Sequence, residues 1–167
     1  MRPVFFLALF VGVSLLMGCQ QPPDPVREAT AQLKPVVEAY VQVWNTGNLS
    51  ALNGICVPQV VRYDRTTDVA RGLDSLKGVI ASIRRSYPDF KVTIEEEFFV
   101  PNHAVVRWSI TGTNTGAGGF TPTGKSFKAT GLSLSRFENG KLAEEHAEYD
   151  RSSVLLQLGV QLGPPAK

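Results

Sequence analysis

The C-terminal stretch from Gly119 to Gly159 constrains the fold more than any other part of the sequence. It holds two strand-like runs separated by Asn139-Gly140. Both residues of this pair tolerate the positive φ angles of a tight turn, which makes the pair the strongest short-range signal for a β-hairpin. A short apolar helix is predicted after the second run. We expect any chemistry of the protein to lie on or beside this second strand.

Alternate residues of the second run share one face of the predicted strand. That face carries Leu142, Glu144, His146, Glu148 and Asp150. Four ionisable side chains in one row indicate either a functional site or a solvated strand face, and both interpretations stay open on the sequence alone.

The preceding residues predict helices first and long strands later. From Val26 to Asn45 the apolar side chains recur every three or four positions, as on one face of an amphipathic helix. A second helix of this kind begins at Leu73 and ends before Tyr87. After Asp89 the period changes to two, which is typical of strands and predicts that Ile94 and Phe98 share one face. This order of elements predicts an α+β domain.

Two further features lie between and after the helices. A short strand is predicted at Val57–Tyr63 and a polar loop at Asp64–Arg71. In the long strand after Asp89, Glu96 falls on the face that is otherwise apolar. A carboxylate at such a position must be paired or face a cavity, unless it lies at the end of the sheet and meets water.

The N-terminus is typical of a secreted bacterial lipoprotein. A basic start is followed by an apolar run from Val4 to Met17, which is shorter than the roughly 20 residues of a transmembrane helix. Leu16-Met17-Gly18-Cys19 resembles a lipobox, in which the cysteine is lipidated and becomes the first residue. We therefore expect a signal peptide at 1–18 and a lipidated Cys19 that begins a tether at 19–25. An ordinary signal peptide that is cut nearby is the alternative.

These features predict attachment to the cell envelope through a lipid anchor. Gln20 stands where an aspartate would resemble an inner-membrane retention signal, so the outer membrane is favoured. The tether is rich in proline and polar residues that build no core.

Charge and cysteine content argue against several classes of protein. The chain has 17 basic and 15 acidic residues, and removal of Arg2 with the signal leaves 16 against 15, a net charge of about +1. Such a balance gives no reason to expect a nucleic-acid partner. Cys56 is the only other cysteine, so neither a disulfide framework nor a Cys-rich zinc site is available.

One motif matches a phosphate-binding loop by letter but not by context. Gly119 to Ser126 fits the pattern G-x-x-x-x-G-K-[ST]. The mechanism of that loop requires a helix after the lysine, because the helix N-terminus holds the phosphates. The run from Phe127 to Phe137 alternates like a strand, so we expect no nucleotide site here.

Motifs spread over most of the chain resemble the SnoaL-like polyketide cyclase (ester cyclase) family of the nuclear transport factor 2-like superfamily. The resemblance covers roughly Val26 to Gly159. The matching segments are Tyr40–Gly47, Arg71-Gly72, Pro88–Phe90, Val105–Trp108, Thr111–Thr113, Pro122–Lys125, Phe137–Glu145, Asp150 and Gln157–Gly159.

This resemblance implies a cone-shaped α+β barrel, in which a curved and mostly antiparallel sheet wraps around the N-terminal helices. The domain would span 26–159 and be followed by a tail at 160–167. The resemblance also implies an apolar pocket for a small hydrophobic ligand and frequent homodimers through the outer face of the sheet. In the cyclases an aspartate near the end of the last strand is the general acid of ring closure, without a metal or an organic cofactor. By motif position it corresponds to Asp150, and we expect its carboxylate to face the pocket.

The chain departs from the family pattern around that aspartate. His146 stands where relatives often have tryptophan, and the preceding strand has Arg136 near the position of the cyclases' partner histidine. Arginine can stabilise an enolate oxygen but cannot accept a proton, whereas histidine can serve in acid–base catalysis. Asp150, His146 and Arg136 are therefore the candidate catalytic residues.

Two classes of function stay open, with a third less favoured. One is an acid–base enzyme of the cyclase or isomerase type, and another is a non-catalytic binding module of the envelope. Metal binding through His146, Glu148 and Asp150 is disfavoured because ligands on one strand rarely converge on one ion. The candidate ligand-binding residues are Tyr40, Trp44, Tyr63, Glu96 and Trp108.

Overall fold

The computed structural model describes residues 24–64, 67–118, 121–161 and 163. The predicted signal peptide at 1–18, the lipidation of Cys19 and most of the tether lie outside these residues, as does much of the predicted tail at 160–167. Within the described ranges, no helix is both long enough and apolar enough to cross a membrane.

The first helix, α1, spans Pro25–Thr46. The Asp24 carboxylate caps it by accepting hydrogen bonds from the backbone amides of its first residues, and Pro25 occupies the first turn, where proline costs no hydrogen bond. Gly47 ends the helix in the left-handed conformation with φ 75°. Helix α1 continues through Pro35, so this proline does not mark its start.

The segment after α1 contains the short elements that close one side of the domain. They are the 3-10 helix η1 (Leu49–Ala51), α2 (Leu52–Ile55), β1 (Cys56–Asp64), β2 (Thr67–Arg71) and α3 (Leu73–Ser86). The strand predicted at Val57–Tyr63 and the helix predicted from Leu73 are confirmed. The polar loop predicted at Asp64–Arg71 is wrong for its second half, because β2 pairs there with β1 as an edge strand.

Long strands make up most of the second half of the chain. They are β3 (Lys91–Val100), β4 (His103–Thr113), β5 (Ser126–Glu138) and β6 (Lys141–Tyr149), and α4 (Arg151–Gln157) follows them. Asn139 and Gly140 have φ angles of 50° and 72°, so the predicted hairpin turn is confirmed. Strand β5 follows Lys125, which confirms that no helix completes a phosphate-binding loop.

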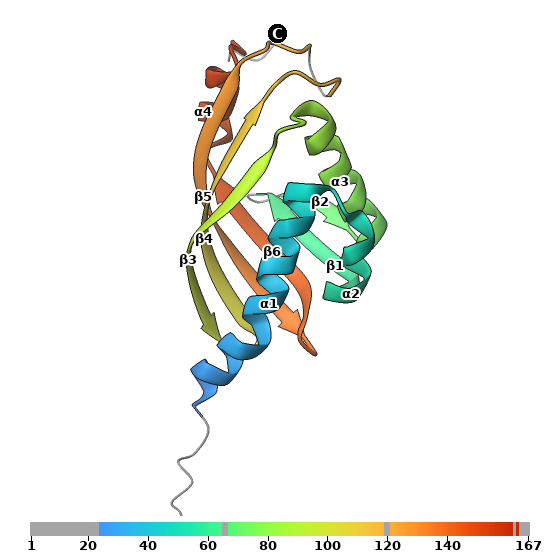
Figure 1. Ribbon diagram of the computed structural model, residues 1–167, viewed down its shortest axis with the longest axis vertical. Coiled ribbons are helices and arrows are strands. Elements are labelled where there is room, and N and C mark those ends of the chain that lie inside the picture. Colours follow the sequence, from blue (N-terminus) through green and yellow to red (C-terminus); the bar gives the residue numbers. More distant parts are fainter. Residues whose placement is uncertain (1–23, 65–66, 119–120, 162, 164–167) are drawn as a thin grey trace, which may run out of the picture.

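The six strands form one curved sheet in the order β2-β1-β6-β5-β4-β3. Only β1 and β6 run parallel, and the other neighbours are antiparallel. Figure 1 shows the long strands curving around α1, with α3 on the same side and α4 next to β5 at the end of the sheet far from the start of α1. The predicted α+β cone is therefore confirmed.

An irregularity in β6 decides which of its side chains face the inside of the cone. Leu142 and Glu144 pair with consecutive residues of β5, so Ala143 is an extra residue in the strand. A bulge of this kind reverses the alternation of side chains beyond it. Leu142 therefore shares the inner face with Glu145 and Tyr149, not with the residues two and four positions after it.

Strand β3 contains a similar irregularity at Glu95. Ile94 and Glu96 pair with consecutive residues of β4, so the alternation reverses between them. The prediction that Phe98 shares the face of Ile94 is wrong: Phe98 is 64% exposed on the outer face, and its neighbour Phe99 is buried.

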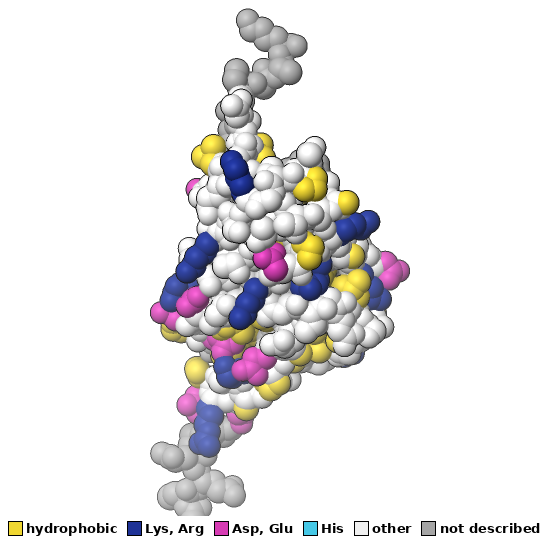
Figure 2. Space-filling view, turned by 45° about the horizontal axis from the view of Figure 1, so that its top comes forward, with side chains coloured by type: hydrophobic (Ala, Val, Ile, Leu, Met, Phe, Trp, Pro, Cys, Tyr) yellow, Lys and Arg dark blue, Asp and Glu magenta, His cyan; other side chains and the backbone are white. Residues whose placement is uncertain are grey.

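The surface carries charges of both signs. Figure 2 shows one face of the molecule, on which basic, acidic and apolar side chains are interspersed. This distribution agrees with the small net charge of the chain.

Candidate functional site

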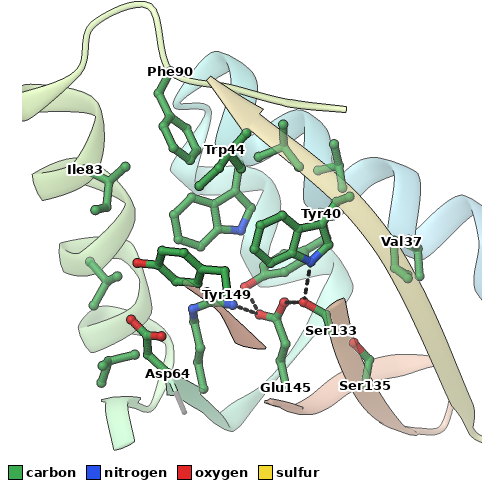
Figure 3. A pocket seen from close by; sticks show the side chains of 18 of the residues that line it. Val37, Tyr40, Trp44, Asp64, Ile83, Phe90, Ser133, Ser135, Glu145 and Tyr149 are labelled. Carbon is green, nitrogen blue, oxygen red and sulfur yellow. Dashed lines mark hydrogen bonds and ion pairs between the residues drawn. The ribbon is translucent and has the colours of Figure 1, made fainter. Parts of the chain in front are cut away.

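A cavity of about 380 Å³ lies inside the cone, between the inner face of the sheet and helices α1, α3 and α4. Its size falls within the range of pockets that bind small molecules. Figure 3 shows side chains from several elements pointing into it. Its aromatic lining consists of Tyr40, Trp44, Tyr87, Phe90, Trp108, Phe127, Phe137 and Tyr149.

The hollow exists because β5 and β6 place small residues on the inner face. Gly131 and Ser133 alternate with the outward Leu132, and an added Cβ at Gly131 would lie 2.4 Å from the Trp108 ring. The Trp108 ring thus lies close to the β5 backbone at Gly131, and Ala147 on β6 adds little bulk. Large side chains at these inner positions would fill the space between the sheet and the helices.

A buried carboxylate, that of Glu145 on β6, organises the polar side of the cavity. Its Oε2 accepts hydrogen bonds from the Tyr40 hydroxyl at 2.8 Å and from Arg62 Nη1, and its Oε1 accepts one from Ser133 Oγ at 2.8 Å. Ser133 in turn accepts a hydrogen bond from Trp108 Nε1 at 3.0 Å. Figure 3 shows Glu145 beside Ser133 within this network.

The network keeps each of its groups in a defined protonation state. Burial would raise the pKa of Glu145, but attraction to Arg62 and the hydrogen bonds that Glu145 accepts outweigh burial and lower that pKa. Burial, followed by the charge of Glu145, raises the pKa of the Tyr40 phenol, so Tyr40 stays a donor. Burial opposes the charge of Arg62, but Glu145 and Tyr40 raise the pKa of Arg62, and the guanidinium stays ionised.

A second carboxylate, Asp64 at the end of β1, lines the same cavity without being satisfied by the protein. Its Oδ1 is buried and has no hydrogen-bond partner among the described residues. Figure 3 shows Asp64 beside Tyr149. Burial, followed by the charge of Asp64, raises the pKa of the Tyr149 phenol. An unsatisfied buried oxygen is costly, so a carboxylate that lines a cavity and keeps one such oxygen is a candidate to bind a ligand group or take up a proton.

Three of the predicted ligand-binding residues line the cavity. Tyr40 and Trp44 come from α1, and Trp108 comes from β4. The rings of Tyr40 and Trp44 meet edge to face with centroids 6.2 Å apart, and Trp108 packs against Tyr149 at 5.9 Å. Their predicted location in an apolar pocket is confirmed, while ligand binding stays a prediction.

Asp150 does not lie where we expected it. Its side chain is exposed, is absent from the wall of the cavity and accepts a hydrogen bond from the Ser153 backbone amide at 3.0 Å, so it caps α4. An aspartate just before a short helix is a preferred N-cap. The expectation that the carboxylate at the end of the last strand faces the hollow is wrong, and its role as an acid stays a prediction.

His146, Arg136 and Tyr63 lie on the outer face of the sheet and not in the cavity. His146 stacks on Tyr63 with ring centroids 4.5 Å apart, and its Nε2 lies 2.8 Å from Glu144 Oε1. Arg136 pairs with Glu144 and Glu138. The structure brings His146 and Arg136 together through Glu144, but the bulge at Ala143 places this group outside. Their proposed catalytic roles stay predictions.

Glu96 also lies outside the cavity. The irregularity at Glu95 turns its side chain to the outer face, where it pairs with Arg107 at 3.2 Å and is 55% exposed. The apparent break in the alternation of β3 is therefore a bulge and not a buried carboxylate.

The sequence interpretation missed Arg62, Asp64 and Glu145. One signal was available for Glu145. The set of residues that contains it on β6 also contains Ala143, Ala147 and Tyr149, and is more apolar than the charged alternate set. The more apolar set of a strand usually faces the core. Arg62 and Asp64 carried no comparable signal because β1 is polar at this end.

Metal-ligating residues do not gather anywhere in the part of the chain that the structure describes: no three His, Cys, Asp or Glu side chains are arranged to hold an ion.

Comparison with known proteins assigns the chain to a family. A sequence model of the SnoaL-like polyketide cyclases matches residues 34–158, well over half of the chain. The chain belongs to this family. The matched residues include Tyr40, Arg62, Asp64 and Glu145, so the cavity and its polar groups fall within the SnoaL-like domain.

Solved structures show the same fold for this SnoaL-like domain. IdmH from Streptomyces antibioticus is 24% identical, with 77% of this chain and 99% of that chain covered and a TM-score of 0.67. TsrD from Streptomyces laurentii is 21% identical, with 78% and 97% covered and a TM-score of 0.70. A Catenulispora acidiphila protein with a ketosteroid isomerase-like fold is 20% identical, with 77% and 97% covered and a TM-score of 0.66. A search of curated proteins finds no match.

The network around Glu145 predicts a specific pH dependence of stability. Because folding lowers the pKa of Glu145 below its ordinary value of 4.5, this group stabilises the fold above that pH, and the contribution is lost as the pH falls through the folded value. Glu145→Gln should lose about 3–5 kcal/mol at neutral pH, since Arg62 is left uncompensated. It should also lose less stability than the unmodified protein as the pH falls below the ordinary value of 4.5.

Urea unfolding across this pH range measures both effects. The matched control is Glu148→Gln on the outer face of the same strand, where the side chain is exposed and a change of no more than about 0.5 kcal/mol is expected. Equal losses in the two variants would contradict the network described above.

Proposed function

We propose that this SnoaL-like protein binds a small hydrophobic molecule in its cavity and transfers a proton on it, with Asp64 as the group that takes up and returns the proton. The observation that carries the proposal is the Asp64 carboxylate in the wall of an aromatic-lined cavity, with one oxygen, Oδ1, that is buried and has no partner among the described residues. Proton transfer needs a base within reach of the substrate and a site from which water is largely excluded.

The simplest reaction of this kind is an isomerisation or ring closure of a carbonyl compound. The Asp64 carboxylate takes a proton from the carbon next to the carbonyl group, and the electron pair of that C–H bond moves to the carbonyl oxygen as an enolate. In an isomerisation, Asp64 returns the proton to a different carbon of the conjugated enolate. In a ring closure, the enolate carbon bonds to a second carbonyl carbon of the same molecule, and the oxygen of that carbonyl takes the proton from Asp64. No oxidant or further reactant is required.

The alternative is a binding module that carries the molecule without reaction. The same cavity and the same family membership are compatible with it, since fold does not fix function. Variants of two aspartates distinguish the enzyme from the binding module, because Asp64 lines the cavity whereas Asp150 caps a helix on the surface.

Native mass spectrometry of the purified protein should reveal a co-purified small molecule, and NMR should show deuterium exchange into it in heavy water. Asp64→Asn should retain the molecule and lose exchange by about a hundredfold or more. Asp150→Asn should leave both unchanged, because asparagine also caps helices. Binding without exchange in the unmodified protein would favour the carrier, and failure to bind small apolar molecules would remove the proposal.

We also propose that two copies associate through the outer face of the sheet. Strand β5 exposes Leu132 and Leu134 there, at 49% and 48%, while Ser133 and Ser135 are buried inside. The strand register aligns Leu134 with Val105 and Val105 with Phe98, which forms a continuous apolar row. This outer row consists of Phe98, Val105, Leu132 and Leu134.

Ion pairs flank the outer row on both sides, Glu96 with Arg107 and Arg136 with Glu144. A surface that meets a second copy of itself about a two-fold axis needs both signs of charge around an apolar centre. The outer row has this arrangement, and exposed apolar rows of this kind mark interaction sites.

Sedimentation of the soluble domain should therefore show a dimer. Leu134→Lys should convert it to a monomer, because a charge in the centre of the contact would be desolvated without a partner. Leu156→Lys on α4, which replaces a leucine that is 58% exposed elsewhere, serves as the control and should stay dimeric. A monomeric unmodified protein, or equal dissociation of both variants, would contradict this contact.

We further propose that Cys19 is lipidated and tethers the domain to the bacterial envelope, in the outer membrane. The lipobox-like Leu16–Cys19 and the proline-rich residues after it support the proposal. Metabolic labelling of bacterial cells with a clickable fatty acid should mark the unmodified protein and not Cys19→Ser. Absence of label from the unmodified protein would contradict the anchor.

A further inference from the structure

Arg62 presents hydrogen-bond donors in the cavity that the protein does not use. Among the described residues, Glu145 is the only acceptor that bonds to its guanidinium, and a single nitrogen, Nη1, makes that bond. Arginine carries five N–H donors in a rigid fork. Since Arg62 lines the cavity, donors on its other nitrogens are available to a ligand.

The guanidinium of Arg62 is held in place before any ligand arrives. It lies over the Trp44 ring, 5.1 Å from the centroid, while Glu145 fixes its Nη1 edge. Tyr40 and Ser133 occupy the remaining sides of the Glu145 carboxylate. A fixed donor in a cavity binds an oxygen more strongly than a mobile one, because no side chain must be ordered on binding.

Arg62 and Asp64 lie two residues apart on the same face of β1, with Tyr63 turned to the outer face between them. The parallel register confirms this, since Arg62 lies beside Glu145, Tyr63 beside His146, and Asp64 beside Ala147. Residues at this spacing are about 6.5 Å apart along a strand. The guanidinium of Arg62 and the carboxylate of Asp64 are thus close enough to contact the same small ring-shaped ligand.

We propose that Arg62 binds the carbonyl oxygen of the ligand, so that the cavity selects apolar ring ketones over hydrocarbons and over amines of the same shape. This inference rests on the proposed function, since it requires that the cavity accept an apolar molecule. In the proton transfer by Asp64, negative charge develops on that oxygen, and Arg62 meets it with a charge already in place.

Three probes with one ring system test the inference on the full protein: methyl naphthyl ketone, ethylnaphthalene and naphthylethylamine. They have closely similar shapes but different polar groups. The ketone offers a hydrogen-bond acceptor, ethylnaphthalene offers no polar group, and the amine offers a cationic donor. Isothermal titration calorimetry should give the ketone at least about tenfold tighter binding than ethylnaphthalene, as expected for a hydrogen bond to a charged group. The amine should bind no better than the hydrocarbon.

A double variant connects this preference with Arg62. Arg62→Gln together with Glu145→Gln removes both charges, so no buried ion is left alone. It should bind ethylnaphthalene as the unmodified protein does and lose the tenfold preference for the ketone. Should this variant not fold, the comparison of the three probes on the unmodified protein still decides.

The outcomes separate this inference from the function on which it rests. If none of the probes binds, the apolar binding site itself is refuted. If ketone and hydrocarbon bind equally, Arg62 does not bind the oxygen, and the apolar site stands. Tightest binding of the amine would also overturn the role of Arg62 and assign the recognition of a cation to Asp64. Retention of the ketone preference by the double variant would overturn it as well.

Discussion

The buried ion pair between Arg62 and Glu145 is the interaction on which the rest of the structure depends. Two charges are stable inside a protein only when they are well paired and further hydrogen bonds support the pair. Here the partners come from β1 and β6, and Tyr40, Ser133 and Trp108 extend the network to α1, β5 and β4. One set of contacts thus fixes the only parallel strand pair of the described sheet and the position of the first helix.

The polar groups of the site differ in whether the protein itself uses all their hydrogen-bonding positions. Glu145 is fully engaged and serves the structure. Asp64 has an oxygen without a partner among the described residues, Arg62 bonds through one nitrogen, and both residues line the hollow. The surrounding wall is mostly apolar, and its other polar side chains include Ser82, Ser135 and Arg151. Acid–base chemistry on a carbonyl compound uses an acceptor for a proton and a donor for an oxygen, and these are the two functions that the protein itself leaves unfilled.

Much of the fold could be predicted from sequence, but most of the site could not. Helical stripes, the turn at Asn139-Gly140 and the change of period after Asp89 gave the elements, because each depends on local chemistry. The bulges at Ala143 and Glu95 depend on how neighbouring strands pair, and a single extra residue moved the charged row of β6 to the outside. Polarity also fails to predict which face of β5 is buried, since Leu132 and Leu134 face out and Ser133 and Ser135 face in.

The most direct test of this account is anomalous diffraction from crystals of the domain soaked in bromonaphthalene. The account predicts a bromine peak inside the cone, in contact with the aromatic wall formed by Trp44, Trp108 and Tyr149. A peak only on the outer face of the sheet, or side chains that fill the space between α1 and the strands, would contradict a ligand-sized hollow and with it the function proposed for this protein.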